Sequence, residues 1–313
     1  MYNLIVVVDR YRNYQPRRYT RQPQKKNHKG LFVVLCVAFL LVGGRSVLNK
    51  VQATGGALSS SASTAPKLKP LIKAEPIATS TWNDISQKVG VIIDQNPGLD
   101  ISVAVIDVST NTKANYGIQD NFAGASTTKV LTAITYLHEA EAGRESMTKT
   151  INGKSIRTHL KQMVNQSNND SWATLNKELT YAKIENYARS LGITSYTYKG
   201  NTITAGDEAL LLQKLFKGEL INETNQKLLL SFMQNTNNED MIPKVIPSGA
   251  TIYHKYGQLE DRLHDAAIVD YNNRPLVVVV YTKGGANDGS NYKIRTSLVK
   301  QLAQSVIETV YTP

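Results

Sequence analysis

A serine and a lysine, Ser126 and Lys129, stand where a loop of small residues gives way to an apolar stretch with helical spacing. Three residues are nearly one helical turn, so the lysine amine is expected to lie over the serine hydroxyl. A desolvated lysine can take the hydroxyl proton, and a helix N-terminus favours the negative charge that develops on the oxygen. The pair therefore has the residue types and the spacing of a nucleophile and its base.

The spacing alone is weak support, because Ser-x-x-Lys recurs at Ser146, Ser290 and Ser297. Two further polar elements later in the chain distinguish Ser126. The first of them is Ser167-Asn168-Asn169, in a loop between two expected helices. A serine here can relay a proton to a leaving amine, and an asparagine two residues on can hold both the lysine and a substrate amide. The alternative interpretation is an ordinary helix cap.

The other element is Lys255-Tyr256-Gly257, expected at the end of a strand over residues 251–255. A lysine inside a cleft keeps the field positive for a carboxylate substrate, and a glycine lets a ligand lie against the strand edge. His254 adjoins this lysine, so its side chain should face the other side of the strand, and we assign it to packing. The five histidines are dispersed, which predicts no metal site, and no cofactor is expected.

Taken in this order, the three elements resemble those of the serine β-lactamase and penicillin-binding protein family, most closely its class A β-lactamase-like branch. The resemblance implies that Ser126 is the acylated nucleophile and that Lys129 is its base or proton relay. It implies that Ser167 passes a proton to the departing nitrogen. It also implies a group of substrate-binding residues, namely Asn169, Lys255, Gly257, Gln258 and His264.

Within that group the expected roles differ. Asn169 would bind the substrate amide, and Lys255 would support the substrate carboxylate. The main-chain N–H groups of Ser126 and Gln258 would form an oxyanion hole. His264 would supply a cationic carboxylate contact, and the alternative for it is a packed, hydrogen-bonded histidine.

The sequence departs from the family pattern at three places. Tyr256 stands where the family has threonine or serine, and Asn168 stands where it has aspartate. The glutamate that activates water in class A β-lactamases is missing, because residues 195–206 contain no acid. Glu185, Asp207 and Glu208 flank that stretch without being obvious substitutes. We therefore expect an acyl-enzyme that is hydrolysed slowly.

The elements that must position these residues predict an α+β fold. Apolar periodicity favours a helix, then two strands, then only helices, then three strands and a closing helix. A five-stranded antiparallel sheet would thus be built from both ends of the domain around a helical insertion, as in the β-lactamase/transpeptidase-like fold. The expected ranges are helix 82–93, strands 101–108 and 113–117, helices 127–140, 156–164, 172–179, 184–191, 207–215 and 225–233, strands 251–255, 264–271 and 275–281, and helix 292–310.

The chain before this domain is different in kind. Residues 1–30 form a basic head, and residues 31–44 contain an apolar run that favours a transmembrane anchor or a signal-peptide core. Residues 45–79 predict a flexible linker, and residues 80–313 the β-lactamase-like domain. The positive flank places the head in the cytoplasm and the domain outside it. We expect a single-pass protein of the cell membrane, or a secreted one if the segment is cleaved.

Charge and cysteine content exclude several functions. The formal net charge of +11 belongs to the first 79 residues, because residues 80–313 carry equal numbers of basic and acidic side chains. A nucleic-acid partner is therefore not expected. Cys36 is the only cysteine and lies in the apolar run, which excludes a disulfide framework and a cysteine nucleophile from the domain.

These observations favour an extracytoplasmic serine acyl-transfer hydrolase acting on β-lactams or on cell-wall peptides ending like D-Ala-D-Ala. The alternative from another class is a membrane-anchored wall-binding or sensor domain on the same fold that does not turn over. A glutaminase-like amide hydrolase is a third, minor possibility.

Overall fold

The computed structural model describes residues 75–285 and 289–312. The predicted basic head, the apolar segment 31–44 and nearly all of the linker lie outside the described residues. Within the described part, no helix combines the length and the apolar character needed to cross a bilayer.

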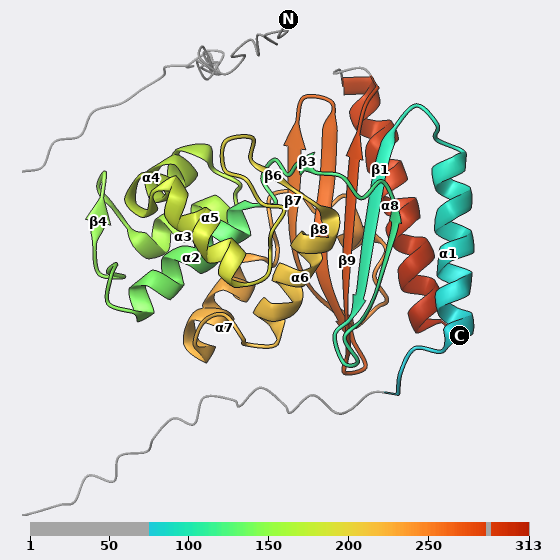
Figure 1. The fold of residues 1–313 in the computed structure, drawn as a ribbon, viewed down its shortest axis with the longest axis horizontal. Coiled ribbons are helices and arrows are strands. Elements are labelled where there is room, and N and C mark those ends of the chain that lie inside the picture. Colours follow the sequence, from blue (N-terminus) through green and yellow to red (C-terminus); the bar gives the residue numbers. More distant parts are fainter. Residues whose placement is uncertain (1–74, 286–288, 313) are drawn as a thin grey trace, which may run out of the picture. The chain divides into compact units, whose positions relative to one another are not determined.

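A five-stranded antiparallel sheet organises the domain, with strand order β2-β1-β9-β8-β7. Val103 pairs with Val280, which joins the first strand of the domain to the last. The predicted sheet assembled from both chain ends is therefore confirmed, and Figure 1 shows these strands side by side. The strands are β1 (Asp100–Asp107), β2 (Thr112–Gly117), β7 (Thr251–Leu259), β8 (Arg262–Tyr271) and β9 (Arg274–Lys283).

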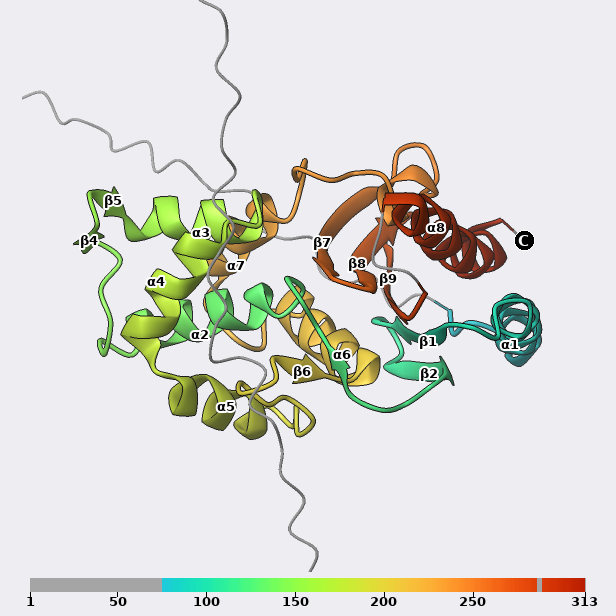
Figure 2. The same cartoon turned by 90° about the horizontal axis from the view of Figure 1, so that it is seen from above.

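Helices cover both faces of this sheet, as the view in Figure 2 makes plain. α1 (Thr79–Asp94) and α8 (Gly289–Tyr311) lie on one face, and α6 (Ala205–Phe216) lies on the other. Strand β9 is apolar over residues 276–280 because Val278 belongs to the core under α1 and α8, while Val277 and Val279 belong to the core on the α6 side. The period-two geometry of a strand thus fills both cores with one run of valines.

The helical insertion carries two of the three motif elements. Its first helix, α2, is buried at every position from Lys129 to Leu137, which makes it the central helix of the insertion. α4 follows α3 after a short loop, and that loop holds the second motif. The helices of the insertion, besides α6, are α2 (Lys129–Glu141), α3 (Ile156–Val164), α4 (Asn169–Leu179), α5 (Tyr181–Ser190) and α7 (Glu223–Phe232).

Several short elements were not expected from the sequence, because strands of two residues carry no periodicity. β3 (Phe122–Ala123) pairs with β6 (Thr202–Ile203) and ties the segment before Ser126 to a later loop. β4 (Thr150–Ile151) pairs with β5 (Lys154–Ser155), and a 3₁₀ turn covers Ile242–Lys244.

Strand β7 also differs from its prediction. It runs on to Leu259, so Lys255 lies inside the strand and not at its end. The hairpin between β8 and β9 is as expected, since Asn272 and Asn273 have φ of 54° and 58°, the conformation of a type I′ turn.

Candidate active site

Ser126 lies in a tight turn immediately before α2 and is partly exposed. The turn is strained, since Ala125 has a φ of 51° without being glycine. Two hydrogen bonds hold it: the Thr127 hydroxyl donates to the Gly124 carbonyl (2.8 Å), and Asn201 Nδ2 donates to the Ala125 carbonyl (2.8 Å). The nucleophile candidate is thus fixed at the N-terminal end of a buried helix.

Lys129 begins α2 and is almost fully buried, with 1% of its surface exposed. Its amine donates to the Ser167 carbonyl and to Asn169 Oδ1, both at 2.7 Å. Both acceptors are neutral, so they do little to hold a proton on the amine. Burial lowers the pKa of Lys129 to about 7, which makes the amine available as a base near neutral pH.

The Ser167 hydroxyl lies between two lysine amines. Lys255 Nζ donates to it at 3.0 Å, and Lys129 Nζ approaches it at 3.4 Å. Lys255 is fully buried, and its pKa is lowered well below the usual value, first by desolvation and then by the charge of Lys129. Two amines that share one hydroxyl in a dry cleft form a route along which a proton can move.

Two interpretations of the loop around Ser167 were made from the sequence, a functional motif that contacts Lys129 and an ordinary helix cap, and the loop contains residues of both kinds. Ser167 has a φ of 54° and faces the lysines, whereas Asn168 is the N-cap of α4, its side chain accepting from Ser171 N at 2.7 Å. Asn169 is exposed and uses its amide oxygen on Lys129. The predicted capping role therefore belongs to Asn168, and its neighbours on either side reach Lys129.

Gly257 is where β7 meets the turn of Ser126. A Cβ at this position would lie 2.9 Å from the Gly124 carbonyl oxygen and 3.0 Å from Ser126 N, closer than such atoms approach one another. The backbone of β7 can approach the nucleophile turn this closely only because residue 257 has no side chain.

The edge position of β7 leaves backbone donors facing away from the sheet. β7 is the last strand in the sheet order, and His254 N donates outward to the Met233 carbonyl at 2.8 Å. Strand geometry alternates, so Gln258 N, four residues on, points the same way. Gln258 follows the residue that contacts Ser126 N, so the two N–H groups of the expected oxyanion hole come from adjoining segments.

His264 does not take the role expected for it as a cationic carboxylate contact. It has no exposed surface, its Nε2 contacts the Ala123 carbonyl at 2.9 Å, and its Nδ1 accepts from Thr282 N at 3.1 Å. Burial lowers its pKa to about 4, so it is neutral. The structure gives His264 the alternative role, a packed and hydrogen-bonded histidine, because β8 points this side chain into the core.

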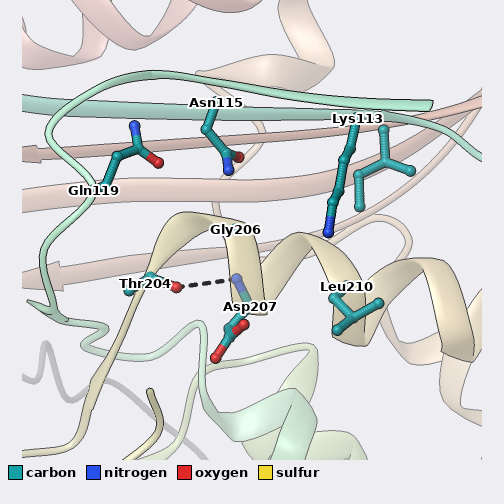
Figure 3. A pocket seen from close by; sticks show the side chains of 8 residues that line it. Lys113, Asn115, Gln119, Thr204, Gly206, Asp207 and Leu210 are labelled. Carbon is teal, nitrogen blue, oxygen red and sulfur yellow. Dashed lines mark hydrogen bonds between the residues drawn. The ribbon is translucent and has the colours of Figure 1, made fainter. Parts of the chain in front are cut away.

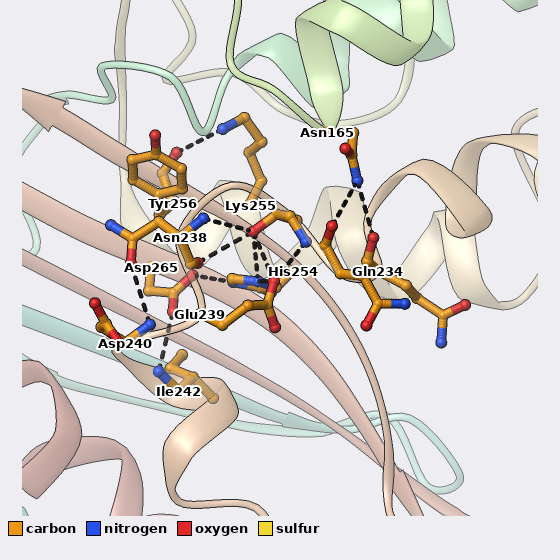
Figure 4. Close-up of polar contacts among 12 residues, drawn as sticks. Asn165, Gln234, Asn238, Glu239, Asp240, Ile242, His254, Lys255, Tyr256 and Asp265 are labelled. Carbon is orange, nitrogen blue, oxygen red and sulfur yellow. Dashed lines mark hydrogen bonds and ion pairs between the residues drawn. The ribbon is translucent and has the colours of Figure 1, made fainter.

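His254 is buried as expected but is more than packing (Figure 4). Its Nδ1 contacts Asp265 Oδ1 at 2.9 Å, and its Nε2 contacts Glu239 Oε1 at 3.0 Å. Burial acts to lower its pKa, but the two carboxylates outweigh that effect and raise it to about 9. Asp265 Oδ2 also accepts from Ile242 N at 3.1 Å, so this buried ion pair anchors the loop before β7.

Two contributors to the site were not singled out as such from the sequence. Asn201 accepts from the Thr128 hydroxyl at 2.7 Å while donating to Ala125, which ties the stretch 195–206 to the nucleophile turn. Tyr256 places its ring 4.3 Å from Lys255 Nζ and interacts with Ser167 and Asn237. The signal for Tyr256 was its place inside the third motif, whereas nothing local distinguishes Asn201 from other loop asparagines.

The acids that flank residues 195–206 are engaged elsewhere. Glu185 accepts from Tyr198 N at 2.5 Å, and Asp207 accepts from the Ser195 main-chain N (2.9 Å) and hydroxyl (2.6 Å). Glu208 is completely buried.

Asp207 also lines a cavity of about 250 Å³ between β2 and α6 (Figure 3). None of the predicted site residues lines this cavity, whose walls include Lys113, Asn115 and Thr204. In the described part of the chain no group of three or more histidine, cysteine or acidic side chains could hold a metal ion.

Known proteins share this fold and sequence pattern. A variant of PBP-A, solved as an acyl-enzyme complex with penicillin G, superposes with a TM-score of 0.66 at 20% identity and covers 72% of this chain and 96% of its own. The reconstructed class A β-lactamase of the last common ancestor of Gram-negative bacteria also gives 0.66, at 19% identity, covering 71% of this chain and 98% of its own.

A β-lactamase of Proteus vulgaris is 23% identical over 289 residues, covering 80% of this chain and 94% of its own length. The fold is that of the β-lactamase/transpeptidase-like serine enzymes. The model of the β-lactamase enzyme family matches residues 84–310, and the chain belongs to this family of serine hydrolases.

The lowered pKa of Lys129 leads to a first prediction. With the neutral amine in its expected role as the base, the rate of acylation by a fluorescent penicillin should rise about tenfold per pH unit below pH 7 as Lys129 loses its proton. Lys129→Arg keeps the charge but holds its proton, and should reduce the rate at least about 100-fold. The exposed Lys161→Arg is the matched control. A rate independent of pH between 5 and 7 would contradict the role of Lys129.

A second prediction concerns the contact of β7 with the nucleophile turn. Gly257→Ala should lower the acylation rate by about tenfold or more, because the new methyl group must displace Gly124 or Ser126 from the geometry that supports the oxyanion. Gly98→Ala, whose Cβ would meet nothing within 4 Å and whose φ, like that of Gly257, is not positive, controls for general destabilisation. Acylation of Gly257→Ala at the unmodified rate would show that the close approach has no part in catalysis.

Proposed function

We propose that this protein is a membrane-anchored, extracytoplasmic serine acyl-transfer enzyme. Its Ser126 is acylated by β-lactams or by cell-wall peptides ending like D-Ala-D-Ala, and the acyl group is released slowly. The observation that carries the proposal is the Ser167 hydroxyl held between the amines of Lys129 and Lys255, beside the turn of Ser126.

Acylation follows from this arrangement. The neutral Lys129 amine takes the proton of the Ser126 hydroxyl as the oxygen attacks the amide carbonyl carbon. The main-chain N–H groups of Ser126 and Gln258 stabilise the negative charge on the carbonyl oxygen. The amide C–N bond then breaks, and Ser167 donates its proton to the departing nitrogen. The protonated Lys129 restores that proton to Ser167, so that acylation ends with the ester at Ser126, a neutral Lys129 and an intact Ser167 hydroxyl.

The substrate class follows from the shared chemistry of the two candidates. β-Lactams and D-Ala-D-Ala ends both place a scissile amide next to a carboxylate. Lys255 supplies a cation to that end of the cleft when a carboxylate raises its proton affinity. Acylation by a β-lactam is further supported by the PBP-A variant, which was captured with penicillin G attached.

Slow release of the acyl group follows from the placement of the acids. Hydrolysis of the ester requires a base that activates water, and residues 195–206 provide no carboxylate. Glu185 and Asp207 are bound to main-chain groups, and Glu208 has no exposed surface. None of these three described acids is therefore free to direct water to an ester formed at Ser126.

A direct test is the mass of the intact protein during treatment with penicillin G. We expect an adduct of one penicillin at Ser126 that persists for hours, and no adduct on Ser126→Ala. Ser297→Ala is the matched control, because Ser297 and Lys300 have the same spacing on the exposed part of α8 and should not matter.

The other outcomes of that measurement discriminate between functions. Rapid turnover of penicillin without a trapped adduct would contradict slow release and indicate a β-lactamase. Folded protein that forms no adduct would contradict acyl transfer and favour a wall-binding or sensor domain.

Membrane attachment rests on the apolar residues 31–44 and the cations that precede them. Deleting residues 31–44 should move the full chain from the membrane fraction to the soluble fraction of the cells that produce it. Deleting an equally long piece of the linker, residues 52–65, is the control and should leave the protein in the membrane. Release of the unaltered chain with an N-terminus beyond residue 44 would show instead that the segment is cleaved and the protein secreted.

A further inference from the structure

Glu208 is a buried carboxyl group behind the nucleophile that the mechanism above does not use. It lies in the first turns of α6 and has no exposed surface. Neither carboxyl oxygen has a well-aligned hydrogen-bond partner among the described residues. The Tyr281 hydroxyl is close enough to interact with the carboxyl.

Tyr281 connects this carboxyl to the turn of Ser126. Its hydroxyl is 2.8 Å from Thr127 Oγ1, and Thr127 in turn donates to the Gly124 carbonyl at 2.8 Å. Thr127 is the neighbour of Ser126, and Gly124 is the residue against which Gly257 packs. A continuous polar path thus runs from α6, through β9, to the backbone that sets the position of the nucleophile.

The number of hydrogen atoms fixes the direction of this path. Thr127 has one hydroxyl hydrogen and donates it to Gly124, so Tyr281 must donate to Thr127. The hydroxyl hydrogen of Tyr281 is then used in the bond to Thr127, so the Tyr281 oxygen can only accept a hydrogen bond from a further group. A protonated Glu208 can donate to that oxygen, whereas an ionised Glu208 would face only lone pairs.

The surroundings of Glu208 agree with a neutral carboxyl. Burial raises its pKa to about 8 and outweighs the opposing effect of the hydrogen-bonding contact with Tyr281, while the charge of Asp207 on the same helix adds to the increase. His264 of β8 stacks on Tyr281 at 4.3 Å but is itself neutral because burial holds its pKa near 4. The titratable groups that interact with Glu208 are the acid Asp207 and the phenols Tyr196 and Tyr281.

We propose that Glu208 is a positioning residue for Ser126, acting in its protonated form through Tyr281 and Thr127 on the turn at Gly124. If Glu208 loses its proton, Tyr281 turns its hydrogen toward the carboxylate and Thr127 turns its own toward Tyr281. The side-chain hydrogen bond to Gly124 is then lost, and the turn that presents Ser126 loosens. The inference rests on the proposed function, because acylation of Ser126 is its main readout.

The consequence is an alkaline limit on acylation that does not come from Lys129. The rate should rise through pH 7 as Lys129 becomes neutral and fall above pH 8 as Glu208 ionises. The rise and the fall of the acylation rate with pH depend on different residues, so a mutation at Glu208 should change only the fall.

The experiment measures acylation by a fluorescent penicillin between pH 5 and 9.5 in four forms of the full chain. Glu208→Leu removes the donor and should slow acylation about tenfold at pH 7, on the scale of one lost positioning hydrogen bond. Glu208→Gln offers an amide donor that does not titrate, so it should recover most of the rate and lack the decline above pH 8. Glu219→Gln, an exposed site just after α6, should behave as the unaltered protein.

A coupling measurement adds a readout that a merely structural role would not produce. Tyr281→Phe cuts the same path, so Glu208→Leu should slow acylation little further in a Tyr281→Phe background. Full additivity of the two changes would overturn the proposal. So would an alkaline decline that persists in Glu208→Gln, or wild-type rates in a folded Glu208→Leu protein.

Stability provides a second readout that does not need acylation. The folded pKa of Glu208 lies above its unfolded value, so its stabilising effect is complete below about pH 4.5 and is lost as pH rises through 8. The unfolding equilibrium constant of the unaltered chain should therefore increase, relative to Glu208→Gln, about tenfold per pH unit between 5 and 8. If no form is acylated, the proposed function fails. In that case a constant stability difference would overturn the neutral Glu208 as well.

Discussion

Two lysine amines crowd one serine hydroxyl in a cleft from which water is largely excluded, and the rest of the site depends on that contact. Amines that close together in a low-dielectric environment cannot both keep a proton without a large electrostatic penalty. Burial lowers the pKa values of both Lys129 and Lys255, and the charge of Lys129 lowers that of Lys255 further. Lys129 thereby becomes a base at neutral pH, and Ser167 becomes the group through which a proton can pass. The fold serves this contact by bringing α2, the loop before α4 and strand β7 to one place.

The backbone around the contact is held in conformations that it would not adopt alone. Ala125 and Ser167 both have positive φ, and each lies beside a residue or atom that takes part in the chemistry. Such backbone conformations persist only where contacts with the surrounding structure offset their energetic cost. Asn201 donates a hydrogen bond to the Ala125 carbonyl. In our proposal, the hydrogen bonds from Glu208 through Tyr281 to Thr127 stabilise the same turn. The buried ion pair of His254 steadies the segment that leads into β7.

The departures from the family pattern separate acylation from release. The two lysine amines and the Ser167 hydroxyl assigned to acylation lie together, whereas residues 195–206, the stretch that would hold a water-activating carboxylate, contain no acid. Tyr256 changes the carboxylate end of the cleft as well, because its ring lies over Lys255 and its hydroxyl interacts with the Ser167 loop. The proposed slow release of the acyl group and the expected difference in substrate recognition rest on these departures.

The sequence by itself determined the order of helices and strands, the sheet built from both chain ends and the three motifs, because hydrophobic periodicity and short residue spacings are local properties. It could not place His264, whose neutral, buried state depends on the backbone of β3 and β9 packed around it. It could not show that Asn201 braces the nucleophile turn or that Glu208 lies behind it, since each contact joins residues more than 70 positions apart. Only the tertiary structure decides such contacts, because burial and the direction of a hydrogen bond are set by what the rest of the chain brings alongside.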